Sequence, residues 1–259
     1  MKETIYTIPV SEAFEKDCEC PLCELKNRFE NESVQYFVGP SLMEPDTRIE
    51  TNDTGFCARH FELMYATKTN RLGIGLMLDT YMQEQTARLR KAFGSGAGAA
   101  ASSAEEDIEK EKKPSLFGKK AVSGGKADKV LRYLEEHEKK CAICKKLDYT
   151  MARYVEIILQ LFFSEKTFRE RIENGKGFCL PHLKLLLETS SKKLSSGKHA
   201  QFSDTVLNVQ LQNLDRIEKE VDWFTKKFDY RNQEAPWGNS RDALIRGIKK
   251  MTGAENIGD

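Results

Sequence analysis

Gly-Phe-Cys-x-x-His occurs twice in this chain, at residues 55–60 and 177–182. Each copy follows a Cys-x-x-Cys pair, at residues 20–23 and 141–144. The spacer between the two pairs has 33 residues in the first case and 34 in the second. Matched motifs at nearly equal spacing indicate an internal repeat. Its fixed points are residue types that bind metal ions.

The spacing inside each pair predicts where the motifs lie on helices. Two residues that are three apart project from the same helix face, about one turn from each other. Pro21 directly follows Cys20 and suits the first position of a helix. A glycine two residues before each later cysteine lets the chain turn into a helix. We therefore expect all the pairs at helix N-termini, where the helix dipole favours thiolates.

Each Cys-x-x-Cys pair is expected to join the Cys-x-x-His pair that follows it. The predicted sets are Cys20, Cys23, Cys57 and His60 in the first half, and Cys141, Cys144, Cys179 and His182 in the second. Three thiolates and one imidazole are typical of a closed structural zinc site. We expect two zinc ions per chain. Iron or an iron–sulfur cluster is the alternative, although histidine ligation is uncommon there. A further alternative treats the cysteines as small buried apolar residues of a duplicated core.

Composition divides the chain into two parts. Residues 94–126 combine glycine, alanine, serine and charge without apolar periodicity, which predicts a flexible linker. On either side, residues 1–93 and 127–259 show apolar residues at three- and four-residue steps and no alternating strand pattern. The sequence therefore predicts an all-α protein with two homologous helical modules, each held by a Cys3His metal site.

The C-terminal part contains an apolar seam at heptad-like spacing. Its residues are Leu207, Leu211, Leu214, Val221, Phe224 and Phe228. This pattern favours a long helix packed on its own module and leaves open a homodimer through residues 203–229. Residues 235–251 predict a final short helix.

Charge and hydropathy exclude several classes of protein. The 41 basic and 40 acidic side chains do not supply the positive field of most nucleic-acid-binding proteins. No apolar run approaches the roughly 20 residues of a membrane span, and the N-terminus lacks a secretion signal. We expect a cytoplasmic protein, in which clustered cysteines bind metal or react rather than form structural disulfides.

Two features keep an enzymatic reading open. The segment 43–54 differs from its counterpart in the second half and gathers Glu44, Asp46, Arg48 and Asn52, a possible polar site. Cys18 has no counterpart and is a bystander, a competing ligand or a redox thiol. No nucleotide-binding, hydrolase or metalloprotease motif accompanies them.

We favour a non-catalytic zinc protein that binds a protein partner or regulates one. A metal-thiolate redox protein or metal-dependent enzyme is the alternative.

The same motifs resemble a known family. "CPLC", "MEPDTRIETNDTGFCARH", "NRLGIGLML", "GFCLPH" and "PWGNSRDAL" are similar to an uncharacterised, Firmicutes-type bacterial family of domains of unknown function. Some of its members are labelled as substrate-binding proteins of ABC transporters. The resemblance implies a duplicated Cys/His module and supplies no catalytic residues. We set the transporter label aside because the chain begins without an export signal.

Overall fold

The protein is all-helical in the part of the chain that the structure describes. The structure is a computed structural model that describes residues 5–94, 126–254 and 257. Within these ranges it contains α-helices and short 3-10 turns and no strand, which confirms the predicted fold class. The predicted linker, apart from its end residues 94 and 126, lies outside the described residues. None of the described helices has the length and apolar character required to cross a bilayer.

The chain forms two compact units that do not coincide with the predicted modules. Unit 1 comprises residues 1–33 and 146–259, and unit 2 comprises residues 34–145. The boundaries fall inside two helices, α2 (Pro21–Val38) and α7 (Ala142–Ser164). The predicted division into 1–93 and 127–259 is therefore not the division of the structure. Each unit takes segments from both predicted modules.

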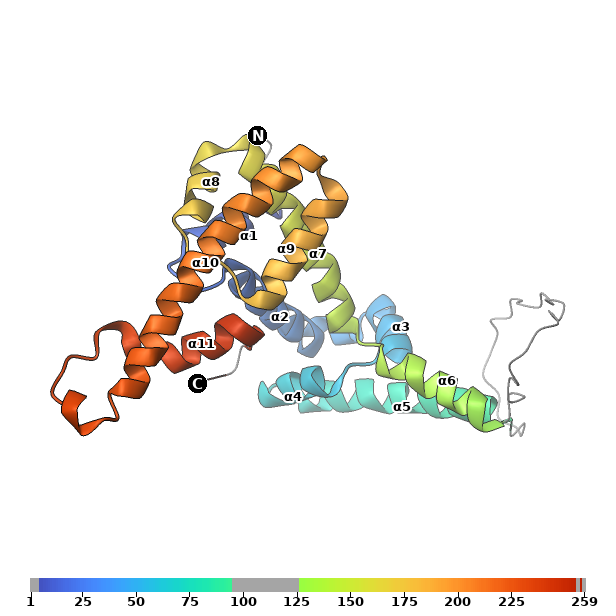
Figure 1. The fold of residues 1–259 in the computed structure, drawn as a ribbon. Helices are drawn as coiled ribbons and strands as arrows, with labels where there is room; N and C mark the ends of the chain where they lie inside the picture. Colours follow the sequence, from blue (N-terminus) through green and yellow to red (C-terminus); the bar gives the residue numbers. More distant parts are fainter. Residues whose placement is uncertain (1–4, 95–125, 255–256, 258–259) are drawn as a thin grey trace, which may run out of the picture. The chain divides into compact units, whose positions relative to one another are not determined.

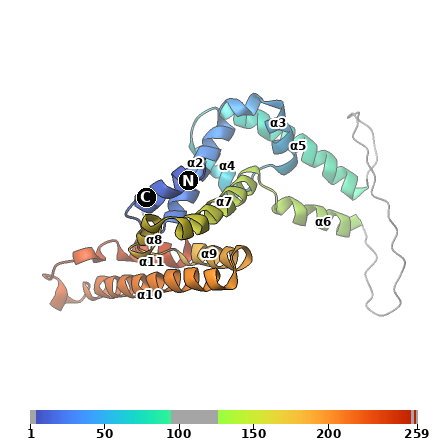
Figure 2. The same cartoon turned by 90° about the horizontal axis from the view of Figure 1, so that it is seen from above.

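Unit 1 contains most of the long helices. Besides the first part of α2 and the second part of α7, it has α1 (Thr7–Glu15), α8 (Lys166–Glu173), α9 (Leu180–Lys193), α10 (Ser196–Lys226), the 3-10 turns η2 (Tyr230–Asn232) and η3 (Gly238–Ser240), and α11 (Ala243–Thr252). α10 contacts α8, α9 and α11, and α9 also contacts α11 (Figures 1 and 2). The final short helix expected within residues 235–251 is α11.

The core of unit 1 forms around α7. Its apolar residues at three- and four-residue steps, including Val155, Ile158 and Phe162, are fully buried. Phe14 of α1 packs on Phe168 of α8, with ring centroids 4.8 Å apart. Burying a large apolar side chain is worth about 1.5–3 kcal/mol, so this core stabilises unit 1 substantially.

Unit 2 is smaller and is built around α5. It has the end of α2, the 3-10 turn η1 (Pro40–Met43), α3 (Pro45–Thr54), α4 (Ala58–Ala66), α5 (Arg71–Phe93), α6 (Lys126–Glu138) and the start of α7. α5 contacts α3, α4 and α6 (Figure 1). Phe37 and Phe56 pack edge to face in the core, with ring centroids 5.0 Å apart. By contrast, α6 has no buried residue.

Candidate metal centres

Each Gly-Phe-Cys-x-x-His motif forms a tight entry into a helix. Gly55 has φ of +56° and Gly177 has φ of +75°, backbone conformations that residues other than glycine rarely adopt. The following phenylalanines, Phe56 and Phe178, are buried and anchor the turn in the core. Cys57 and Cys179 then occupy the N-cap positions of α4 and α9. The histidines follow in the first helical turn, where spacing places them beside the cysteines.

The Cys-x-x-Cys pairs have a corresponding arrangement. Cys20 directly precedes α2, and Cys141 directly precedes α7. The backbone N–H of Cys23 donates to the carbonyl of Cys20 at 3.0 Å. The N–H of Cys144 donates to the Sγ of Cys141 at 3.4 Å. The prediction that all the pairs lie at helix N-termini is thus confirmed.

In unit 1, four ligand-type side chains converge to form site 1. It consists of Cys20, Cys23, Cys179 and His182, whose ligand atoms all lie within 4.8 Å of one another. The Nδ1 of His182 is 3.1 Å from the Sγ of Cys179 and 3.5 Å from that of Cys20. The Sγ atoms of Cys23 and Cys179 are 3.6 Å apart.

Unit 2 contains the equivalent site 2. It consists of Cys57, His60, Cys141 and Cys144, again with all ligand atoms within 4.8 Å. The Nδ1 of His60 is 3.2 Å from the Sγ atoms of both Cys57 and Cys141. The Sγ atoms of Cys57 and Cys144 are 3.9 Å apart.

The predicted pairing of the motifs is wrong, although the same eight residues form the two sites. Each Cys-x-x-Cys pair joins the Cys-x-x-His pair of the other repeat. Helix length gives the physical reason. α2 has 18 residues and extends about 27 Å from its Cys-x-x-Cys end, whereas α3, which follows, has 10 residues and spans about 15 Å. In the second repeat, α7 has 23 residues and α8 has 8, about 35 Å against 12 Å. In each repeat the helix that follows is thus shorter than the helix that begins at the cysteine pair, which fits a Cys-x-x-His pair that lies away from its own Cys-x-x-Cys pair.

One sulfur–sulfur distance in each site matches that of a tetrahedral metal site. Zinc–sulfur bonds of about 2.3 Å place two tetrahedral sulfur ligands about 3.8 Å apart. The Sγ–Sγ distances of 3.6 Å and 3.9 Å agree with this value. All four donors come from protein side chains, so each set forms a closed site with no position reserved for water.

Without a cation, neither site can keep all its thiols ionised. Although burial opposes it, hydrogen bonds from neighbouring ligands hold the pKa of Cys20 well below its usual range. Hydrogen bonding to Cys179 and Cys20 raises the pKa of Cys23. Burial disfavours the imidazolium of His182, but hydrogen bonds with Cys179 and Cys20 raise its pKa to about 9. A divalent cation would displace the protons that remain on these groups.

Site 2 shows the same division of charge. Burial acts against ionisation of Cys141, yet its hydrogen bond with His60 lowers the pKa to about 6. Burial and the neighbouring Cys141 raise the pKa of Cys144. Each metal-free site therefore combines a favoured thiolate with a protonated thiol. This arrangement suits a centre that exchanges protons for a metal ion.

Cys18 lies next to site 1 but is not among its ligands. It is partly buried and borders a small pocket of about 160 Å³ together with Cys20 and Cys23. Burial raises the pKa of its thiol to about 11. Cys18 is thus a neutral thiol at physiological pH and a poor nucleophile.

The polar segment 43–54 mostly forms α3, which brings together two of its four predicted site residues, Arg48 and Asn52, at Thr80. Arg48 donates to the hydroxyl of Thr80 at 2.7 Å, and that hydroxyl donates to Asn52 at 2.8 Å. These two residues therefore attach α3 to α5. The side chains of Glu44 and Asp46, by contrast, are exposed to solvent. The packing of α3 on α5 explains why segment 43–54 differs from its counterpart in the second repeat.

No pattern in the sequence predicts the buried charge network that lies beside site 1. Glu19, the residue before Cys20, pairs with Arg216 at 2.7 Å. The Lys250 side chain is 0% exposed and donates to the carboxylate of Glu19 at 3.3 Å. Its Nζ also donates to the backbone carbonyls of Glu19, at 2.7 Å, and of Lys176. Arg246 completes the network by pairing with Glu19 and Glu220. Lys250 thereby fastens α11 to the segment that begins site 1.

Comparison with known proteins gives a family and no activity. No curated protein matches the chain, and no solved structure does. The model of one family matches residues 1–257, which includes both metal sites and both units. The chain therefore belongs to this family of unknown function, DUF6062.

Proposed function

We propose that each site binds one zinc ion and that each ion stabilises the unit in which it is bound. The observation that carries this proposal is the pair of closed Cys3His sets with tetrahedral dimensions. Such sites contribute about 10–16 kcal/mol of apparent binding free energy, comparable with the net stability of a whole domain. A set with four protein donors stabilises a fold rather than activating water.

We infer a non-catalytic role as a protein-interaction or regulatory module. Exposed large apolar side chains on α5, such as Leu72, Leu76 and Met82, support protein binding. The enzymatic alternatives have less support. Cys18 is kept neutral by burial, and Arg48 and Asn52 are engaged in packing. None of the seven cysteines forms a disulfide, which supports a reducing compartment such as the cytoplasm.

The repeat supports a proposal about the origin of this arrangement. The element order after each Cys-x-x-Cys pair is the same: a helix with the pair at its start, a shorter helix, a helix with the histidine, and a long helix. We infer a duplicated module in which the two copies exchanged their cysteine-bearing N-terminal segments. In site 1, the exchange lets one metal ion link residues more than a hundred positions apart, such as Cys20 and Cys179.

Metal content tests the zinc proposal. The full chain is purified without added metal or chelator and is measured by elemental analysis and absorption spectroscopy. We expect two zinc ions per chain and no visible absorption. Iron with a sulfur-to-iron charge-transfer band would contradict zinc and favour redox chemistry. A chain that is folded, metal-free and unable to bind zinc would refute the structural role.

A further inference from the structure

The long helix α10 has two apolar faces, of which unit 1 buries only one. The buried face includes Phe202, Val206, Val209 and Ile217. Part of the seam that the sequence predicts lies on another face, because Leu207 and Leu211 project about a quarter-turn or more away from these buried residues. Leu207 is 39% exposed and Leu211 is 59% exposed. The prediction that α10 packs on its own unit is correct, but its core contact uses residues beside the predicted seam.

α11 extends the uncovered seam into a groove. Arg246 pairs with Glu220, and Lys250 and Arg216 both contact Glu19, so α10 and α11 run antiparallel. Gly247 allows α11 to approach α10 closely, since a Cβ at this position would lie 3.3 Å from the side chain of Val221. Between the helices lies a groove of about 710 Å³.

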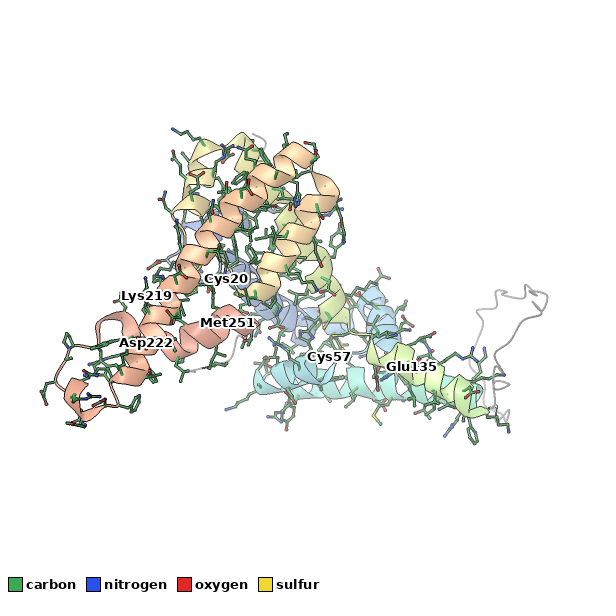
Figure 3. All side chains as sticks on the ribbon, in the orientation of Figure 1. Cys20, Cys57, Glu135, Lys219, Asp222 and Met251 are labelled. Atoms are coloured by element: carbon green, nitrogen blue, oxygen red, sulfur yellow. The ribbon has the colours of Figure 1, made fainter. Side chains whose placement is uncertain are left out.

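The groove face is apolar and partly open to solvent. We define it as Leu214, Val221, Leu244, Ile248 and Met251, which line the groove, together with Leu207 and Leu211, which are exposed elsewhere on α10. On the α11 side, Leu244 is 47% exposed and Met251 is 55% exposed. Figure 3 labels Met251 on α11 and Asp222 on α10. An antiparallel helix pair with one open apolar seam is half of a four-helix bundle.

The charges along this face indicate which helices could complete the bundle. Asp215 and Glu218 lie at exposed positions along the α10 edge, and the exposed Asp222 pairs with Lys226 at 2.6 Å. Two α10 helices packed on each other would place these acids together, which is unfavourable. The α11 edge has the exposed Arg241 just before the helix, and the neighbouring Asp242 is neutralised by its pair with Arg246 at 2.9 Å. Packing α10 of one copy on α11 of another therefore sets an acidic edge against a basic residue, and twofold symmetry repeats that pairing.

We propose that the groove face binds a second copy of this chain, with α10 of each protomer packed against α11 of its partner. The contact buries the seam that unit 1 leaves exposed and forms a symmetric four-helix bundle. It extends the homodimer that residues 203–229 allow by assigning half of the interface to α11. The interface does not include the metal ligands, so the two proposals rest on different residues of unit 1.

Sedimentation velocity over a concentration series tests the interface with the full-length protein. We expect a dimer for the unaltered chain. Leu244→Glu should raise the dissociation constant about a hundredfold, because symmetry buries two unpaired carboxylates. Leu131→Glu is the matched control: Leu131 is 55% exposed on α6 and should leave the dimer unchanged. Circular dichroism verifies that each variant is folded. If Leu244→Glu does not fold, Met251→Glu takes its place in the test.

A charge exchange then tests the orientation of the helices. Glu218→Arg and Arg241→Asp should each weaken the dimer about threefold to tenfold, and the double variant should recover the original affinity. A monomer at every concentration overturns the proposal, as does a dimer that tolerates Leu244→Glu. Metal analysis of the same samples separates the two proposals. A zinc-loaded monomer refutes only the dimer, and a metal-free dimer refutes only the zinc function.

Discussion

Site 1 and site 2 have the same donor atoms but different surroundings. Site 1 lies in the larger core, and the buried Lys250 fastens α11 to the residue preceding Cys20. Site 2 lies in the smaller core. The neighbouring α6 has no buried residue and contacts α5 through the hydrogen bond between Tyr81 and His137 at 2.6 Å. Under the proposed zinc function, the motif supplies the ligands, and the packing around them should determine how firmly each ion is retained. We expect site 2 to release its metal first.

Removing a ligand should have the largest effect and should act on one unit only. Cys179→Ser is expected to unfold unit 1, since the site contributes about 10–16 kcal/mol. Both tryptophans, Trp223 and Trp237, belong to unit 1, so tryptophan fluorescence reports on that unit alone. Cys57→Ser should leave this fluorescence unchanged while helix content falls. Cys18→Ser is the control and should alter neither signal. Equal fluorescence changes for Cys57→Ser and Cys179→Ser would contradict the assignment of one site to each unit.

Lys250 tests the additional support of site 1. Lys250→Ala removes the donor to two backbone carbonyls and to the Glu19 carboxylate. The loss of one buried charge partner should cost about 3 kcal/mol of unfolding free energy in unit 1. Denaturant unfolding followed by tryptophan fluorescence measures it. Lys249→Ala, at the neighbouring, less buried position, should cost less than about 0.5 kcal/mol. Similar losses for both variants would show that the network does not stabilise site 1.

The motif glycine is an equivalent probe for unit 2. Gly55→Ala introduces a Cβ at φ of +56°, within 2.2 Å of the Tyr81 ring. We expect a loss of about 2 kcal/mol from backbone strain and displacement of the ring. Gly75→Ala is the control, because its Cβ would meet nothing within 4 Å. Gly75 lies inside α5, so this change should stabilise the helix by about 1 kcal/mol. Thermal unfolding of the two variants should shift in opposite directions, and a shift in the same direction would count against the tight motif turn.

Acid should weaken metal binding by protonating the ligands. The raised pKa of His182, about 9, means that a proton competes with the metal for this ring throughout the neutral range. Metal affinity of site 1 should therefore fall as pH falls, about tenfold per pH unit for each proton displaced. Competition with a chromophoric chelator at about pH 8 and about pH 6 measures the change. An affinity independent of pH would mean that the metal does not bind through these groups.

The sequence predicted the ligands and their helix positions because both depend on local rules. Three-residue spacing, Pro21 and the motif glycines define helix N-termini without knowledge of the fold. The pairing depends instead on the lengths of the helices between the motifs. Pro40 and Pro45 mark the end of α2 and the start of the short α3, so part of this signal was present. α7 ends without such a marker, since Ser164 and Glu165 interrupt the helical pattern without proline or glycine.

Contacts between distant segments were beyond the reach of local patterns. Lys250 lies in a basic, amphipathic stretch that would ordinarily be solvated, and only tertiary packing brings it to Glu19. The apolar seam of α10 was correctly identified as a helix face. However, the residues that face the core, such as Val206 and Val209, lie next to it. Which of two neighbouring stripes is buried depends on where α7, α8 and α9 lie.

The exchange of cysteine pairs between the repeats is tested most directly by the metal stoichiometry of two double variants. Cys23→Ser with Cys179→Ser removes two ligands of site 1, whereas Cys23→Ser with Cys57→Ser removes one ligand from each site. Native mass spectrometry counts the zinc ions retained by each variant. The structure predicts one zinc ion for the first variant and none for the second. The reverse result, none for the first and one for the second, would show that each cysteine pair binds metal with the histidine pair of its own repeat.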